Sequence, residues 1–154
     1  MSYTAKIINH LEITLNNDLK EVGSRVTAQE ITVDGLVYEA RTTVATEYVE
    51  ETLWETGDGN VDSFDILAFE SDQDVLLCLR NDAGTDEFAL FKVEANVPLI
   101  LTSDDLRGRD DGTSPVGDGS GSGTVTTLKQ VDKITVQNNS TGGTTANVRL
   151  LLLD

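Results

Sequence analysis

Short apolar runs separated by polar connectors dominate the middle of the chain. Three of them follow one another at Phe64–Phe69, Val75–Leu79 and Phe88–Val93. Runs of this length, bounded by Asp- and Gly-bearing connectors, are too short for helices and have the length of strands. The pattern predicts a three-stranded antiparallel meander, and the rest of the chain is expected to add strands that cover and extend it.

Alternation of apolar and polar residues continues the β pattern toward the N-terminus. Ile7, Leu11, Ile13 and Leu15 share one parity, which is typical of a half-buried strand. Farther along, residues 26–33 and residues 36–44 are two β-rich runs on either side of Asp34-Gly35. Because Asp and Gly tolerate the positive φ of a type I′ turn, the sequence predicts a hairpin between these runs.

The segment Thr46–Glu55 has an ambiguous pattern. Tyr48, Val49, Leu53 and Trp54 could form a helical stripe, and its glutamates favour a helix. The β-branched, Thr-rich run that leads into the segment favours a strand instead, and a strand is the interpretation adopted here.

The C-terminal third is also predicted to be β structure. Val97–Leu101 contains Pro98, which lacks a backbone donor and therefore favours an edge strand. Residues 103–123 form a long Gly/Asp-rich loop, of a kind that is usually either functional or mobile. Val125–Val136 and Ala146–Leu153 are predicted to pair as a closing hairpin, with the last strand held inside a sheet.

These expectations give eight to ten strands at a spacing of roughly 8–12 residues, without helices alternating between them. The predicted fold class is all-β, a two-sheet antiparallel β-sandwich of jelly-roll or Ig-like form. Residues 1–154 are expected to form one domain, and a flattened barrel is the alternative.

The net charge of −16 limits the classes of partner. Nucleic acid and anionic membrane surfaces are both disfavoured, because binding to them needs clusters of Lys and Arg. The charge is also uneven: between Glu47 and Glu87 there are thirteen acidic residues and one basic residue, Arg80. This asymmetry predicts either a solvated acidic face, or complementary packing with another copy or with a basic partner.

The chain contains few residues that could carry out catalysis. The single cysteine, Cys78, is expected to be a small buried hydrophobe, and the single histidine, His10, has no recognisable Ser or Cys nucleophile to activate. Zinc would need further His or Cys ligands. The stretch GDGSGSG lacks the lysine of a phosphate-binding loop, and one tryptophan is too few for the aromatic platforms of a glycosidase. We therefore expect no enzymatic activity and no cofactor.

Calcium remains an alternative for the acidic residues. Asp58, Asn60 and Asp62 have the spacing that begins an EF-hand loop, but Ser63 and Phe69 occupy the positions where that loop requires Gly and Glu. An EF-hand is therefore excluded. A separate Ca²⁺ site could still be built from the aspartates of the long loop, which are Asp104, Asp105, Asp110, Asp111 and Asp118.

Two stretches resemble those of a known class of proteins. VEANVPLILTSDDL (Val93–Leu106) and VDKITVQNNSTGGTTANVRLLLLD (Val131–Asp154) resemble small structural proteins of tailed bacteriophages, of the accessory capsid, decoration or neck class. The resemblance implies a non-enzymatic virion protein, made in the host cytoplasm and placed on the capsid surface. It further implies binding to the major capsid protein or other virion proteins, and a homo-oligomer such as a trimer. The alternative is a host- or glycan-binding module of a phage fibre or neck, with residues 103–123 as the recognition edge.

The least regular segments are the candidate contact elements. In the N-terminal segment these are Tyr3 and Lys6, and in the long loop they are Leu106, Arg107 and Arg109. The two loop arginines lie among acidic residues and suit pairing with carboxylates of a neighbouring protein. The alternative is that all five are ordinary exposed side chains. The N-terminus has no apolar core of a signal peptide, so no secretory address is expected.

Overall fold

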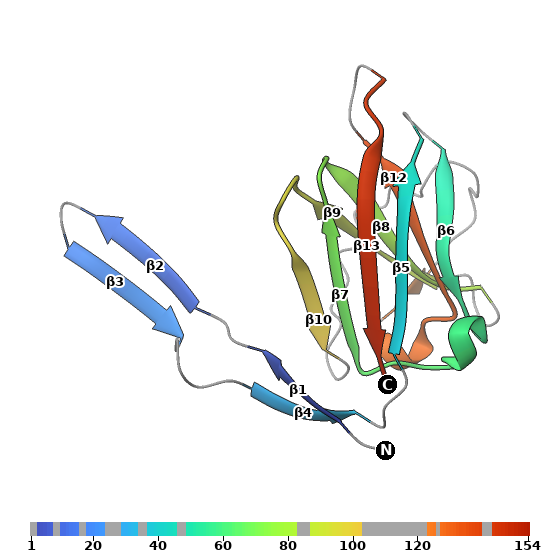
Figure 1. The fold of residues 1–154 in the computed structure, drawn as a ribbon, viewed down its shortest axis with the longest axis horizontal. Helices are drawn as coiled ribbons and strands as arrows, with labels where there is room; N and C mark the ends of the chain where they lie inside the picture. The colour runs from blue at the N-terminus through green and yellow to red at the C-terminus, as the bar shows by residue number, and fades with distance from the viewer. Residues whose placement is uncertain are drawn as a thin grey trace. The chain divides into compact units, whose positions relative to one another are not determined.

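The computed structural model describes residues 3–7, 10–15, 18–23, 29–33, 37–45, 49–82, 87–102, 123–125, 127–139 and 143–154 (Figure 1). The chain divides into two compact units, Met1–Gly35 and Leu36–Asp154. The sandwich belongs to the second unit, whereas one domain over residues 1–154 is expected from the sequence. Within the described residues, no helix is long and apolar enough to cross a membrane.

The first unit contains two antiparallel pairs of strands. β1 (Tyr3–Ile7) pairs with β4 (Gln29–Val33), and β2 (His10–Leu15) pairs with β3 (Asp18–Gly23). The strand predicted from Ile7 to Leu15 is confirmed for Leu11, Ile13 and Leu15, which lie in β2, whereas Ile7 ends β1. Each pair is a two-stranded sheet of its own.

The second unit is a two-layer sandwich. Its four-stranded sheet has the order β10-β7-β13-β5, formed by β5 (Val37–Val44), β7 (Ile66–Ser71), β10 (Leu99–Thr102) and β13 (Ala146–Leu153). Its five-stranded sheet has the order β11-β9-β8-β12-β6, formed by β6 (Glu50–Glu55), β8 (Val75–Asn81), β9 (Glu87–Val93), β11 (Gly123–Thr124) and β12 (Lys133–Asn138). Two short 3₁₀ helices complete it, η1 (Asp58–Asn60) and η2 (Leu128–Gln130). The predicted two-sheet all-β fold is confirmed.

The order of the strands is that of a jelly roll. The chain moves between the layers so that β5, β7, β10 and β13 lie in one sheet and β6, β8, β9 and β12 in the other. All neighbours within the sheets are antiparallel except β11, which runs parallel to β9. Eight strands wound in this way make two Greek keys, the arrangement of a jelly roll. The first of the two predicted forms is thus the one observed.

This winding also explains why two predicted strand pairings are wrong. β7 does not pair with β8, and β12 does not pair with β13. The predicted meander keeps only the β8–β9 pair, and β12 faces β13 across the core. Outside the sandwich, β4, the first strand of the hairpin expected at Asp34-Gly35, pairs with β1. Local turn residues predict pairing between strands that are consecutive in sequence, whereas a Greek key joins most consecutive strands across the two sheets.

The core lies between the two sheets, which overlap in Figure 1. Alternate residues of β13, namely Val148, Leu150 and Leu152, are buried there, as their parity predicts. β13 lies between β5 and β7, so the C-terminal strand is held inside its sheet as expected. Edge strand β10 directly follows Pro98, which confirms the edge position expected for that segment.

β6 is a strand, as favoured for Thr46–Glu55, and it carries the largest buried side chain. Its pairing with β12 shifts register between Ile134 and Thr135, where β6 contains one extra residue. This bulge lets two consecutive residues, Leu53 and Trp54, both enter the core. The Trp54 ring meets the Phe64 ring edge to face, with a centroid distance of 5.2 Å and an interplanar angle of 87°.

Replacing Trp54 should test this packing. Trp54 is fully buried, and its indole Nε1 has no hydrogen-bond partner among the described residues. Trp54→Ala should therefore lower the free energy of unfolding by about 3–5 kcal/mol, as expected for a large cavity in a core. Trp54→Phe should cost clearly less, because it keeps an aromatic ring and removes an unpaired buried donor. Urea unfolding followed by circular dichroism measures both, and equal losses for the two variants would contradict this account.

Candidate functional site

The outer face of the four-stranded sheet carries an unusual group of polar residues. On β5, β7 and β13, alternate residues point into the core, so the residues between them point to the outside. We call the polar part of this surface the arginine face. From β5 it contains Glu39, Arg41 and Thr43, and from β13 it contains Asn147 and Arg149. It also contains Glu70 of β7 and Asp72, which directly follows β7.

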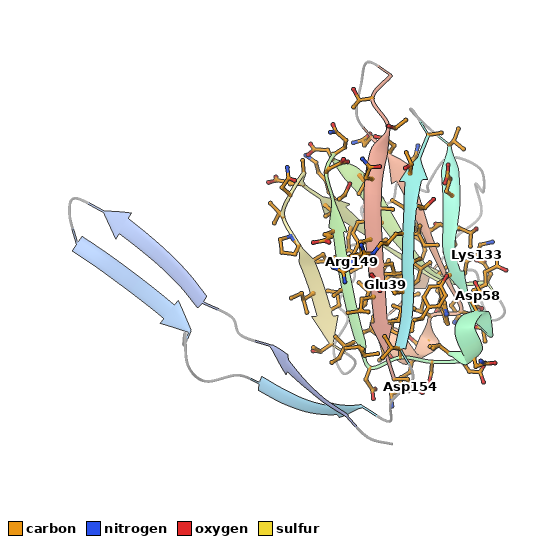
Figure 2. The ribbon with its side chains drawn as sticks, in the orientation of Figure 1. Glu39, Asp58, Lys133, Arg149 and Asp154 are labelled. Carbon is orange, nitrogen blue, oxygen red and sulfur yellow. The ribbon has the colours of Figure 1, made fainter. Side chains whose placement is uncertain are left out.

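Two arginines stand directly opposite each other at the centre of the arginine face. The pairing of β13 with β5 places Arg149 opposite Arg41, although they are far apart in sequence. Both use Nε to donate to the same oxygen, Oε1 of Glu39, at 2.7 Å from Arg41 and 2.9 Å from Arg149. Like charges directly across a strand pair destabilise a sheet, and the shared carboxylate offsets that repulsion. Figure 2 shows Glu39 and Arg149 on neighbouring strands.

The terminal groups of the two guanidiniums are only partly used. Nη1 of Arg149 lies 3.6 Å from Oε1 of Glu70. The Nη groups of Arg41 have no hydrogen-bond partner among the described residues. The Arg41 side chain is 67% exposed and that of Arg149 is 43% exposed. Since a guanidinium has five N–H donors, this pair keeps donors available for an acceptor from outside.

A second polar cluster continues the arginine face along the same strands. The backbone N–H and side-chain Nδ2 of Asn147 donate to the two carboxylate oxygens of Asp72, at 2.7 and 2.6 Å. The Thr43 hydroxyl donates to Oδ1 of Asn147 at 3.0 Å. Asp72 is therefore tied to β13, and its carboxylate is already occupied.

Two adjoining cavities open on this surface. The larger, of about 590 Å³, is lined mainly by polar residues, among them Arg41, Arg149, Asn96 and Asn147. The smaller, of about 130 Å³, is more apolar and is lined by Ala68, Phe69, Glu70, Pro98, Ile100, Arg149 and Leu151. The two cavities share Glu70, Pro98 and Arg149. A charged site and an apolar site thus lie side by side on one exposed sheet face.

Hydrogen bonds lower the pKa of two carboxyl groups on the arginine face. The pKa of Glu39 lies below its usual value, first because Arg41 donates to it and next because Arg149 does. The pKa of Asp72 is lowered by the side-chain and then the backbone hydrogen bond from Asn147. Both groups therefore carry negative charge at neutral pH.

The opposite face of the sandwich contains a buried ion pair. Arg80 of β8 donates through Nε and Nη2 to Oε1 of Glu50 on β6, at 3.1 and 2.7 Å, and the Thr135 hydroxyl donates to the same oxygen. Arg80 is 5% exposed. Cys78, next to this pair along the sheet, is buried as predicted. An ion pair enclosed in this way ties β6, β8 and β12 together and is structural.

Only part of the predicted contact set lies within the described residues. Tyr3 and Lys6 belong to β1, where the register places Tyr3 opposite Val33 and Lys6 opposite Glu30. Leu106, Arg107 and Arg109 lie outside the described residues, as do the loop aspartates considered for calcium. In the part of the chain that the structure describes, no group of three or more His, Cys, Asp or Glu residues could hold a metal ion.

The arginine face was not predicted from the sequence, although part of its signal is present there. Glu39, Arg41 and Thr43 alternate with core-facing residues, and Asn147 and Arg149 do the same on the last strand. That parity identifies two polar faces. Only the pairing of β5 with β13 makes them one surface, and the hairpin expected at Asp34-Gly35 assigned β5 to a different partner.

Comparison with known proteins adds no relative. No family model, no curated protein and no solved structure matches the chain. The function must therefore be argued from the geometry of the arginine face and the fold.

The acid sensitivity of Glu39 provides a first test. Because its folded pKa is lowered, its stabilising contribution is present above the unfolded pKa and is lost as the pH falls through the folded pKa. Glu39→Gln should therefore lower the melting temperature at about pH 7, and the difference from wild type should shrink as the pH falls below the usual pKa of a glutamate. Thermal melts across this range measure the effect. Glu94→Gln, an exposed change outside the arginine face, is the control.

The buried ion pair provides a second test. Glu50→Ala should lower the free energy of unfolding by about 1–3 kcal/mol, because it removes the carboxylate that accepts from the buried Arg80 and from the Thr135 hydroxyl. Glu55 lies on the same strand and pairs with Lys133 at 2.9 Å, but the Glu55 side chain is exposed and that of Lys133 only half-buried. Glu55→Ala should consequently cost no more than about 1 kcal/mol. Equal losses in denaturant unfolding would show that burial of the pair does not matter.

Proposed function

We propose that this chain is a non-enzymatic structural protein of a virion, which decorates the capsid by binding the major capsid protein. In this proposal it acts as a homo-oligomer, with a trimer as the first arrangement to test, and it functions by binding other virion proteins through its surface. The observation that carries the proposal is the exposed arginine face with its adjoining apolar cavity. Arginine beside apolar contact area, with a polar surround, is the composition found in protein–protein interfaces.

The surface next to the arginine face has the exposed apolar area that such contacts need. Ile100 is 45% exposed, and Val37 at the opposite edge of the sheet is 52% exposed. Leu151 and Leu153 lie between them on β13 and are partly exposed. A sheet face that joins these aliphatic residues to paired arginines offers both contact area and orientation to a partner protein.

The first unit supports the same function. Among the described residues it consists of two-stranded sheets, and a two-stranded sheet is marginally stable in water without further packing. A segment of this kind gains stability when a partner covers it. Tyr3 and Lys6 of β1 are therefore the contact residues proposed in the first unit.

The fold is also compatible with the proposal. Jelly rolls occur in viral capsid proteins and in lectins. This is an analogy between folds and carries no residue roles, since one fold serves many functions.

The proposal predicts where the protein is found. Purified particles from cells that make it should contain the chain in a fixed number of copies, resolved by cryo-microscopy on the outside of the capsid. Its absence from particles, with the whole pool remaining free in the lysate, would refute the proposal. Co-sedimentation of the purified chain with particles that lack it serves as the control for specific binding.

The polar cavity favours one second candidate, a host- or glycan-binding module. Its volume of about 590 Å³ and its lining of Arg, Asn, Asp and Thr residues match the size and chemistry of a small-ligand site. A glycan array distinguishes the two functions. Binding that is lost on Asn147→Ala would favour the glycan-binding function, and an array without any bound glycan would remove it.

A further inference from the structure

We infer that the arginine face and its apolar cavity together recognise an extended segment of a partner protein that carries an acidic side chain and an aliphatic side chain on the same face. The inference rests on the proposed protein-binding function of this surface and names the chemistry of the partner. The carboxylate would bind the Arg41–Arg149 pair, and the aliphatic side chain would enter the cavity beside it.

The arginine pair fits a carboxylate. Glu39 already accepts one Nε donor from each guanidinium, which fixes both side chains with most of their terminal N–H groups still available. Fixed, forked donors of this kind bind carboxylates through two parallel hydrogen bonds. Oε1 of Glu70 forms an ion pair with Nη1 of Arg149 at 3.6 Å, too long for a hydrogen bond, so this donor still lacks a hydrogen-bond acceptor. Asp72 is occupied by Asn147 and does not compete either.

The smaller cavity fits an aliphatic side chain. Ala68, Pro98, Ile100 and Leu151 contribute apolar walls to its volume of about 130 Å³. An apolar cavity of about 150 Å³ holds a molecule the size of benzene, so this one accommodates a single branched aliphatic side chain. The side chain of Ala68 is small, and a larger side chain at this position would fill the cavity.

The spacing of the two subsites fits an extended segment. Arg149 lines both cavities, and Leu151, two residues along β13, lines the apolar one. Residues i and i+2 of a strand lie on one face, about 6.6 Å apart along it. An extended partner presents its own residues with the same period. One acidic and one aliphatic residue separated by a single residue therefore match the two subsites.

Short peptides test this directly on the full-length protein. The probe is acetyl-Glu-Ser-Leu-amide, titrated into the isotope-labelled chain and followed by NMR. It should shift the signals of Arg41, Arg149 and Ile100 together. Acetyl-Gln-Ser-Leu-amide and acetyl-Glu-Ser-Gly-amide, which each lack one anchor, should bind about two- to fivefold more weakly. Equal affinities for all three peptides, or no shifts on this face, would overturn the inference.

Variants separate recognition from folding. Arg149→Gln should weaken binding of the first peptide, and Ala68→Leu should do so by filling the apolar cavity. Arg149→Lys keeps the charge without the forked donors and should restore little binding, since geometry as well as charge is required. Lys92→Gln, which removes an exposed positive charge from the other sheet, is the control and should leave binding unchanged. An Arg149→Gln variant that is folded and binds like wild type would overturn the inference.

The result is distinguishable from that of the virion proposal. If the protein occupies particles and the Arg149→Gln variant occupies them equally well, the inference about this face is wrong and the virion proposal stands. If the peptides bind as expected but the chain is absent from particles, the inference stands and the virion proposal is wrong.

Discussion

The pairing of β13 with β5 is the constraint on which both the fold and the arginine face depend. Eight residue pairs join the two strands, and β13 pairs on its other side with β7. The register is fixed because Val148, Leu150 and Leu152 must be buried, and a slip by one residue would turn them all outward. The same register forces Arg149 to lie opposite Arg41. The like-charge contact is thus a consequence of core packing, and Glu39 makes it tolerable by binding both arginines.

The positions of the strands were predictable because buried and exposed residues alternate along them. The partners of the strands were not predictable, because they depend on contacts between residues far apart in sequence. Val148, Leu150 and Leu152 are buried in alternation with more exposed residues of β13, and Cys78 is buried as expected. By contrast, Asp34-Gly35 indicates a turn and says nothing about which strands lie beside β4 and β5 in the fold. A hairpin signal is local, whereas strand order in a jelly roll depends on contacts between the two ends of the second unit.

The candidate site was hard to predict for the same reason. Each of its strands shows an alternating polar face, but no single segment contains the site. Arg41 and Arg149 lie more than a hundred residues apart, and Glu39 joins them with hydrogen bonds that no sequence motif encodes. The contact residues chosen from the sequence came from its least regular segments. Alternating charges on a strand ordinarily indicate a solvated surface, so a regular sheet face gives no sequence signal of a contact site.

The negative charge of the chain makes the arginine face selective in binding an acidic partner. With a net charge of −16, most of the surface repels an acidic partner. On the arginine face, the three carboxylates of Glu39, Glu70 and Asp72 outnumber the two arginines by one, yet the guanidiniums retain donors that the carboxylates do not use. An acidic segment is therefore opposed by long-range electrostatics over most of the molecule and accepted by directional hydrogen bonds at one place. Such an arrangement favours one orientation of docking over others, because complementarity contributes more to specificity than to affinity.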